Sequence, residues 1–156
     1  MTRHSTTGYI VLLEMVAILV KSAGQKSVAL SVTEAELMAA VACAQDMLYT
    51  MRILESMGLQ VEKPMILQVD NSGAVDIANN WSVSNRTRHV DTRLHFLREM
   101  KEQGIIKTVW VSGELNAADM FTKNLPGPLF NTHVKSVCGE DKYGQSNAQD
   151  REGVGS

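Results

Sequence analysis

The longest apolar segment of the chain sets the strongest limit on its fold. The residues from Thr33 to about Met57 predict one helix, ended by Gly58, with apolar side chains on every side. Such a helix needs cover on several faces, so we expect a sheet on one side and other helices beside it. The chain of 156 residues, 44% hydrophobic and 21% charged, suits a single domain with one core.

The remaining pattern alternates between strands and helices. Strands are predicted at Gly8–Leu13, Ala17–Lys21, 27–31, 65–70 and 105–111, and shorter helices at 71–80, 91–104 and 116–125. We read the Val-, Ile- and Leu-rich run from Tyr9 to Val20 as buried strand, covered on both faces. An antiparallel start followed by crossover units predicts an α/β fold with one mixed sheet and flanking helices.

Composition narrows the class of protein. With 15 Lys and Arg against 17 Asp and Glu, the net charge is -2, so nucleic-acid binding would need a local basic patch. Cys43 and Cys138 lie far apart and outside any CxxC pattern, which favours a reducing compartment over a disulfide framework or zinc site.

The ends of the chain carry two further expectations. The run from Tyr9 to Val20 is interrupted by Glu14 and is too short to span a bilayer, so we expect neither a signal peptide nor a transmembrane helix. An intracellular location, cytoplasmic or nuclear, follows from that interpretation. The segment from Gly139 is polar and glycine-bearing. We therefore expect a domain over 1–136 and a disordered tail over 137–156.

Three acids stand at element ends. Glu36 falls in the first turn of the long helix, Asp70 ends the strand MILQVD, and Asp119 lies near the start of the last predicted helix. A structural explanation is available, because Thr33 with Glu36 forms a capping-box pattern, and Asn116 with Asp119 repeats it. The other explanation is functional, since the winding described above brings all three acids to one edge of the sheet.

Clustered carboxylates require a counter-charge. Side by side they raise one another's pKa unless a cation neutralises them. Oxygen ligands suit Mg²⁺ or Mn²⁺, and two such ions about 4 Å apart can hydrolyse a phosphodiester.

Four blocks of sequence carry a family resemblance: SVALSVTEAELMAA, LQVDNSGAVDIA, RTRHVDTRLHFLRE and NAADMFTKNL. In this order and spacing, from about Ser5 to Leu125, they closely resemble the ribonuclease H domain at the carboxyl end of copia-type retrotransposon Pol polyproteins. The resemblance implies a ribonuclease H-like mixed sheet and metal-dependent hydrolysis of the RNA strand of RNA-DNA hybrids. It implies that Glu36, Asp70 and Asp119 are catalytic metal ligands for Mg²⁺ or Mn²⁺, whereas Glu34 supports the helix start.

The same resemblance shows what this sequence lacks. The family's first strand carries an aspartate and lies mid-sheet, but here no acid precedes Glu14. We expect an N-terminally truncated copy, or a fragment of a longer polyprotein, with unpaired strand edges or a new pairing. The family's glycine-rich hairpin turn is replaced by Glu14, Met15 and Val16, so the turn must be remodelled. Nuclease activity of this chain alone should be weak or absent.

A local basic patch could supply the nucleic-acid contact. Its cationic residues are Arg86, Arg88, Arg93, Arg98 and Lys101. Interleaved acids make a solvated helix face with internal ion pairs the competing interpretation. The expected partners are an RNA-DNA hybrid and the upstream reverse transcriptase region of the same polyprotein, with a homodimer through an open sheet edge as a further prospect. The alternatives are a non-catalytic remnant that at most binds nucleic acid and, less favoured by ELMAA and VDNSGA, an integrase-like core.

Overall fold

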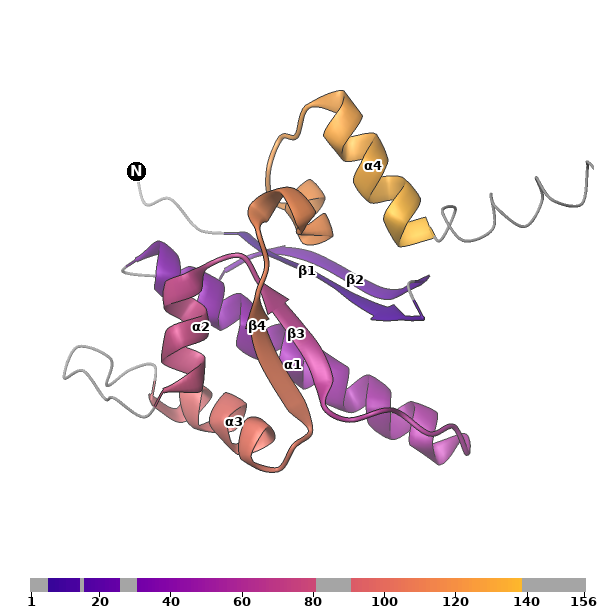
Figure 1. Ribbon diagram of the computed structural model, residues 1–156, viewed down its shortest axis with the longest axis vertical. Coiled ribbons are helices and arrows are strands. Elements are labelled where there is room, and N and C mark those ends of the chain that lie inside the picture. Colours follow the sequence, from indigo (N-terminus) through magenta and orange to yellow (C-terminus); the bar gives the residue numbers. More distant parts are fainter. Residues whose placement is uncertain (1–5, 15, 26–30, 81–90, 139–156) are drawn as a thin grey trace, which may run out of the picture.

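The computed structural model describes residues 6–14, 16–25, 31–80 and 91–138. The expected strand at 27–31, except Ser31, and most of the expected tail lie outside these residues. The strands are β1 (Thr6–Leu13), β2 (Val16–Gly24), β3 (Met65–Val69) and β4 (Ile106–Trp110). The α-helices are α1 (Val32–Ser56), α2 (Ser72–Asn79), α3 (Asp91–Glu102) and α4 (Gly127–Cys138), and two short 3-10 segments are η1 (Gly113–Leu115) and η2 (Ala117–Phe121). The order is the predicted α/β order up to β4 (Figure 1).

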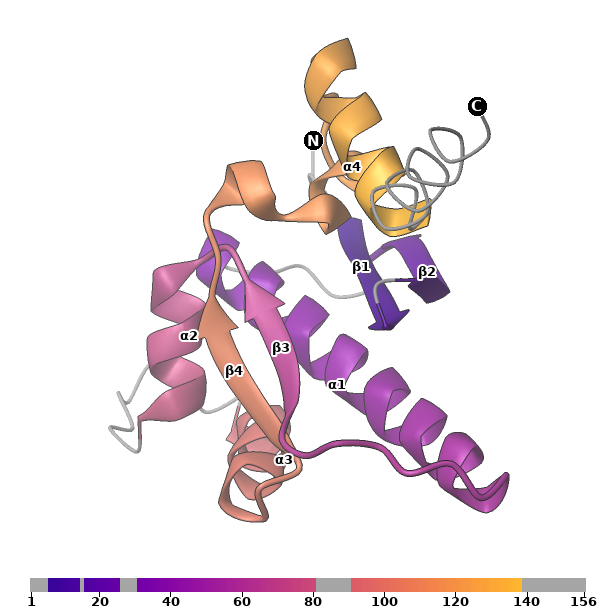
Figure 2. The same cartoon turned by 45° about the vertical axis from the view of Figure 1, so that its right-hand side comes forward.

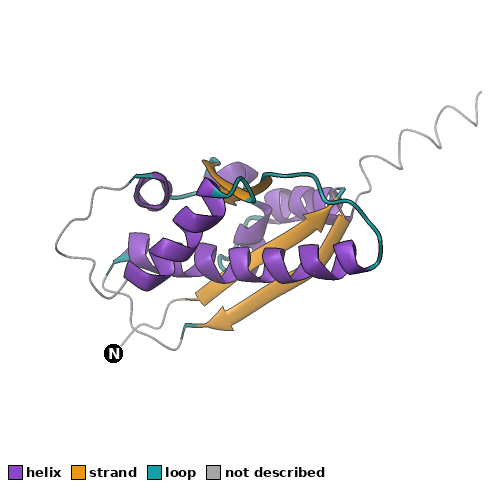
Figure 3. Ribbon diagram, turned by 90° about the horizontal axis from the view of Figure 1, so that it is seen from below, coloured by secondary structure: helices purple, strands orange, loops and turns teal. Residues whose placement is uncertain are grey.

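The helix α1 is the centre of the core. Its N-cap is Ser31, whose hydroxyl accepts a hydrogen bond from the backbone amide of Glu34. The expected capping box between Thr33 and Glu36 is therefore wrong, and Glu36 is free of a capping role. The helix contacts β1, β3, α2 and α3, and Figure 3 shows it running across the hairpin. By length and composition it could cross a membrane, but almost half of its most apolar window is buried inside the protein, as expected of a core helix.

The strands β1 and β2 form an antiparallel hairpin with an irregularity between Val11 and Leu12. Glu14, in the hairpin turn, has φ 48°. A non-glycine residue therefore takes the left-handed conformation that glycine would adopt at lower cost. The expectation that this hairpin is covered on both faces is wrong. The buried residues of β1 alternate with half-buried ones, and Ile18 and Val20 on β2 are exposed.

The strands β3 and β4 pair in parallel, with Met65 opposite Ile106 and Val69 opposite Trp110. The connection between them carries α2 and α3, as a parallel pair requires. Leu67, Val69 and Ile106 from these strands join α1 in the core.

The strands form two separate two-stranded sheets rather than one mixed sheet. Among the described residues, β1 pairs with β2 and β3 pairs with β4, and no strand joins the two pairs. Figure 2 shows the hairpin and the parallel pair side by side, with α1 packed against both. Among the described residues no strand lies between β1 and β3, so no backbone pairing joins the two sheets, and α1 packs against both.

The C-terminal part differs most from the prediction. Instead of one helix over 116–125, it forms η1 and η2, and then α4, which the sequence analysis missed. Pro128 stands in the first turn of α4, where its missing N–H costs nothing. His133 and Val137 are buried at helical spacing, a pattern that could have predicted α4.

Candidate functional site

Asp70 follows the last residue of β3 and faces a cavity. The next residue, Asn71, is the N-cap of α2, and its side-chain oxygen accepts from the amide of Ala74 at 2.9 Å. Because Asn71 does the capping, the Asp70 carboxylate is available for other partners. Its side chain is 13% exposed.

Asp119 is buried on η2. The side chain of Asn116 caps this segment by accepting from the amide of Ala118, and its amide group also donates to Asp119 Oδ1 at 3.5 Å. Contact with β1 holds the segment in place, because the backbone of Gly8 comes so close that a Cβ there would lie 2.3 Å from Thr122 Cγ2. The predicted capping box of Asn116 with Asp119 is thus wrong: Asn116 accepts from the amide of Ala118, the amide of Asp119 donates to the carbonyl of Asn116, and only the two side chains contact each other.

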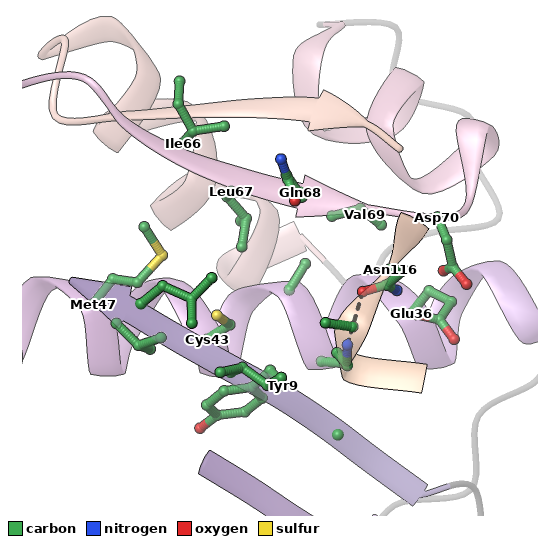
Figure 4. Close-up of a pocket in the computed structure, with 18 residues that line it drawn as sticks. Tyr9, Glu36, Cys43, Met47, Ile66, Leu67, Gln68, Val69, Asp70 and Asn116 are labelled. Atoms are coloured by element: carbon green, nitrogen blue, oxygen red, sulfur yellow. Dashed lines mark hydrogen bonds between the residues drawn. The ribbon is translucent and has the colours of Figure 1, made fainter. Parts of the chain in front are cut away.

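Glu36 lies in the same cavity as Asp70. Figure 4 shows the two carboxylates near each other at one end of the cavity, one on α1 and the other after β3. Burial raises the pKa of Glu36 above its ordinary value, the negative charges of Asp70 and Asp119 add to the rise, and Lys123 opposes it. The charges of Asp70 and Asp119 therefore both act on Glu36, the third of the acids named from the sequence.

Lys123 is the residue that the sequence analysis missed. Its ammonium lies 2.8 Å from Asp119 Oδ2 and 3.2 Å from Asp70 Oδ2, so one cation bridges two acids that are 49 residues apart. The hydrogen bond to Asp119 is the main cause of a raised pKa for Lys123, which keeps the side chain charged. The spacing of four residues from Asp119 was a signal for that pair, but nothing local indicated Asp70.

The cavity has a volume of about 240 Å³. It is bounded by β1 on one side, β3 on the other, α1, and residues 116–118. Its polar end holds Glu36, Asp70 and Asn116, and its apolar end reaches Met47 (Figure 4). The cavity therefore lies between the two sheets, where no strand of the described chain joins them.

The donors fit a hard divalent cation in chemistry and in part in geometry. Asp70 and Asp119 each direct an oxygen to one positive charge. A Cβ at Gly113 would lie 3.7 Å from Asp119 Oδ2 and 3.9 Å from Asp70 Oδ2, so the glycine leaves room beside both oxygens. Within the described ranges, however, no three His, Cys, Asp or Glu side chains are grouped closely enough to hold one ion. Asp70 and Asp119 thus converge on the ammonium of Lys123, and Glu36 lies near them without contacting it.

The expected basic patch is only partly described. Arg86 and Arg88 lie outside the described residues. Arg93 is exposed on α3. Lys101 is exposed too, and its ammonium donates to the carbonyl of Asn79. Arg98 is 5% exposed and donates to the carbonyls of Ile77 and Asn80, so it ties α3 to α2 and does not extend a basic surface.

Comparison with known proteins shows that the chain is similar to retrotransposon polyproteins. It is 39% identical over 128 residues to the retrovirus-related Pol polyprotein from transposon TNT 1-94 of Nicotiana tabacum, a match that covers 82% of this chain and 10% of the relative. It is 31% identical over 133 residues to the Pol polyproteins from transposons RE1 and RE2 of Arabidopsis thaliana, covering 85% of this chain and 9% of each relative. The chain is a homologue of retrotransposon Pol polyproteins.

This Pol homologue spans about a tenth of the length of the curated relatives it matches. The homology supports a retroelement-derived region, as the sequence blocks had indicated, and other regions of the same polyprotein accompany that region in the relatives. No protein-family model matches the chain, and no solved structure matches it with significance.

Proposed function

We propose that this chain is a ribonuclease H-like domain of a copia-type retroelement, built to hydrolyse the RNA strand of an RNA-DNA hybrid with Mg²⁺ or Mn²⁺. The observation that carries the proposal is the convergence of Asp70 and Asp119 on one positive charge, beside Glu36. The Pol homology supports the retroelement origin. The nuclease assignment rests on the sequence resemblance together with this acidic end of the cavity.

The roles of the acids follow from their surroundings. Asp70 and Asp119 would hold the cation, because each already directs Oδ2 to one charge and each side chain is largely shielded from water. Glu36 would be the third ligand, and its raised pKa makes its ionisation depend on the arrival of positive charge. When bound, divalent ions supply activation of water and stabilisation of the leaving oxygen in phosphodiester hydrolysis.

We expect the activity of this chain by itself to be weak or absent. The aspartate of the family's first strand has no counterpart in the 156 residues. Glu14 does not replace it, because it lies in the exposed hairpin turn and does not line the cavity. The paired ions of the family would lack their shared ligand here.

A second candidate function is a non-catalytic remnant that at most binds nucleic acid. Two observations favour it: the described residues contain no group of three metal-ligating side chains, and Lys123 already neutralises part of the charge on Asp70 and Asp119. For either candidate function we propose three partners: an RNA-DNA hybrid, the upstream reverse transcriptase region of the polyprotein, and a second copy of the chain.

Cleavage of a labelled RNA-DNA hybrid separates the two candidates. The proteins to compare are the chain, its Asp70→Asn variant, and a version with an added N-terminal strand that bears an aspartate, each with Mn²⁺ or Mg²⁺ and with chelator. Asp76→Asn is the matched control, because Asp76 is exposed on α2 and lies outside the cavity.

Each outcome decides a different point. Cleavage by the extended form alone, abolished by Asp70→Asn within it, supports the ribonuclease H proposal with an impaired chain. Unaided cleavage that Asp70→Asn removes supports the site and refutes the impairment. An inert extended form favours the remnant.

A further inference from the structure

Lys123 reaches the acids from solvent. Its side chain is 53% exposed, whereas those of Asp70 and Asp119 are 13% and 10% exposed. The ammonium is therefore the accessible member of a cluster whose anionic members are largely shielded from water. Lys123 lies two residues after the end of η2 and is not part of a helix, so its exposed side chain can turn away without disturbing the packing of the core.

The position of the ammonium is the one that a bound cation would need. The two Oδ2 atoms that it contacts are also the two oxygens beside the open space at Gly113. A divalent ion on these oxygens would compete for the same lone pairs and would repel the ammonium. Binding of Lys123 and binding of a metal ion at this pair of oxygens therefore oppose each other.

We propose that Lys123 is an internal counter-cation, which joins Asp70 to Asp119 in the metal-free protein and is displaced when Mg²⁺ or Mn²⁺ binds. This inference rests on the proposed function in one respect: it takes these acids as the metal ligands. Lys123 is then a residue that sets metal affinity by holding the ligands in the metal-free state. The exchange is purely one of ions, since the metal enters, the lysine leaves with its proton, and no covalent bond changes.

The expected effect is a gain in metal affinity when the lysine is removed. Two charge-assisted hydrogen bonds no longer have to be broken, and each is worth roughly a factor of ten or more in an equilibrium constant. Partial compensation by water in the variant reduces the gain. We therefore expect Lys123→Met to bind Mn²⁺ about ten to a hundred times more tightly than the unchanged chain.

Isothermal titration with Mn²⁺, without nucleic acid, tests this inference. The matched control is Lys63→Met, because Lys63 forms a 2.8 Å ion pair with Glu55 on the surface, and its loss changes the net charge equally. Lys123→Arg keeps the positive charge and should bind Mn²⁺ about as weakly as the unchanged chain. Adding Asp70→Asn to Lys123→Met should remove the gain.

Thermal unfolding provides the second readout. Without metal, Lys123→Met leaves two shielded carboxylates without their ammonium, so its Tm should fall, and Mn²⁺ should raise it more than in the unchanged chain. If Lys123→Met does not fold, Lys123→Gln retains a hydrogen-bond donor without the charge and takes its place.

Equal Mn²⁺ affinity of the unchanged chain and a folded Lys123 variant would overturn the inference, and so would a gain of the same size in Lys63→Met. Tighter binding confined to the Lys123 variants supports it. The outcome is independent of cleavage. A gain in affinity together with an inert extended form keeps this inference and removes the proposed function, and cleavage by the extended form without such a gain does the reverse.

Discussion

Gly8 is where β1 touches the segment that carries Asp119, which makes it a sharp test of how the site is held. A Cβ added there would lie 2.3 Å from Thr122 Cγ2 and 3.5 Å from Phe121 Cβ. Contacts as short as the first do not occur between carbon atoms, so Gly8→Ala must push η2 away from the hairpin or rotate Thr122. Gly24 on the neighbouring strand has nothing within 4 Å of its added Cβ and provides the control.

The size of the effect follows from the geometry. Overpacking costs about 1–3 kcal/mol, and the exposed Thr122 side chain can yield, so a cost of about 1–2 kcal/mol is expected for Gly8→Ala. For a chain of this size each kcal/mol lowers Tm by roughly 2–4 °C, which gives a fall of about 2–8 °C. Gly24→Ala should leave Tm unchanged or raise it, because Gly24 is the last residue of β2 and replacing glycine by alanine inside a strand gains at most about 0.5–1 kcal/mol.

The assay is thermal unfolding followed by circular dichroism on both variants and on Gly8→Ala combined with Thr122→Ser. The serine removes the Cγ2 that the new methyl group meets and keeps the hydroxyl. The double variant should therefore recover most of the lost Tm, as a coupled pair does in a double-mutant cycle. If Gly8→Ala is as stable as Gly24→Ala, or if Thr122→Ser gives no recovery, the contact does not hold η2 on β1.

Three further predictions test the core, the cavity and the cysteines. Leu97→Ala should cost about 2–5 kcal/mol in denaturant unfolding because Leu97 is 2% exposed, whereas Leu115→Ala, 74% exposed, should change little. The pKa of Glu36 is raised in the folded protein, so its ionisation opposes folding and stability falls as the pH rises through the folded-state pKa. Glu36→Gln should therefore raise Tm near neutral pH. A gain of the same size at acid pH would contradict this. Burial raises the pKa of Cys43 to about 12 while Cys138 is exposed, so a thiol reagent should label one cysteine of the native protein and none after Cys138→Ser.

The regular elements could be predicted because their signals are local. Gly58 and Gly104 follow the ends of α1 and α3 with φ of 84° and 67°, the conformation that favours glycine after a helix. Asn71 caps α2 where the turn residues predicted a helix start. Periodicity and caps depend on residues within a few positions of each other, and these are what a single sequence displays.

The features that could not be predicted depend on long-range packing. Arg98 carries a charge, yet it stands four residues after the buried Leu94 and so shares its helix face. Its guanidinium donates to the carbonyls of Ile77 on α2 and of Asn80 after it. Composition placed it on a basic surface, and only the packing of α3 on α2 removes it from there. The separation of the two sheets was expected, but only from the family resemblance, in which the absent mid-sheet strand leaves unpaired edges; no local pattern states which strand pairs with which.

The three acids belong to different parts of the fold, and this has a consequence for the site. Asp70 ends β3 in one sheet, Asp119 is held through η2 against β1 in the other, and Glu36 stands on α1, which contacts both sheets. No backbone pairing within the described residues joins the sheets across the cavity. The bridge through Lys123 is thus a direct polar link between the parts that carry Asp70 and Asp119. A cation that replaces the lysine must take over this link, so binding at the acids and the spacing of the two sheets are coupled through the same two oxygens.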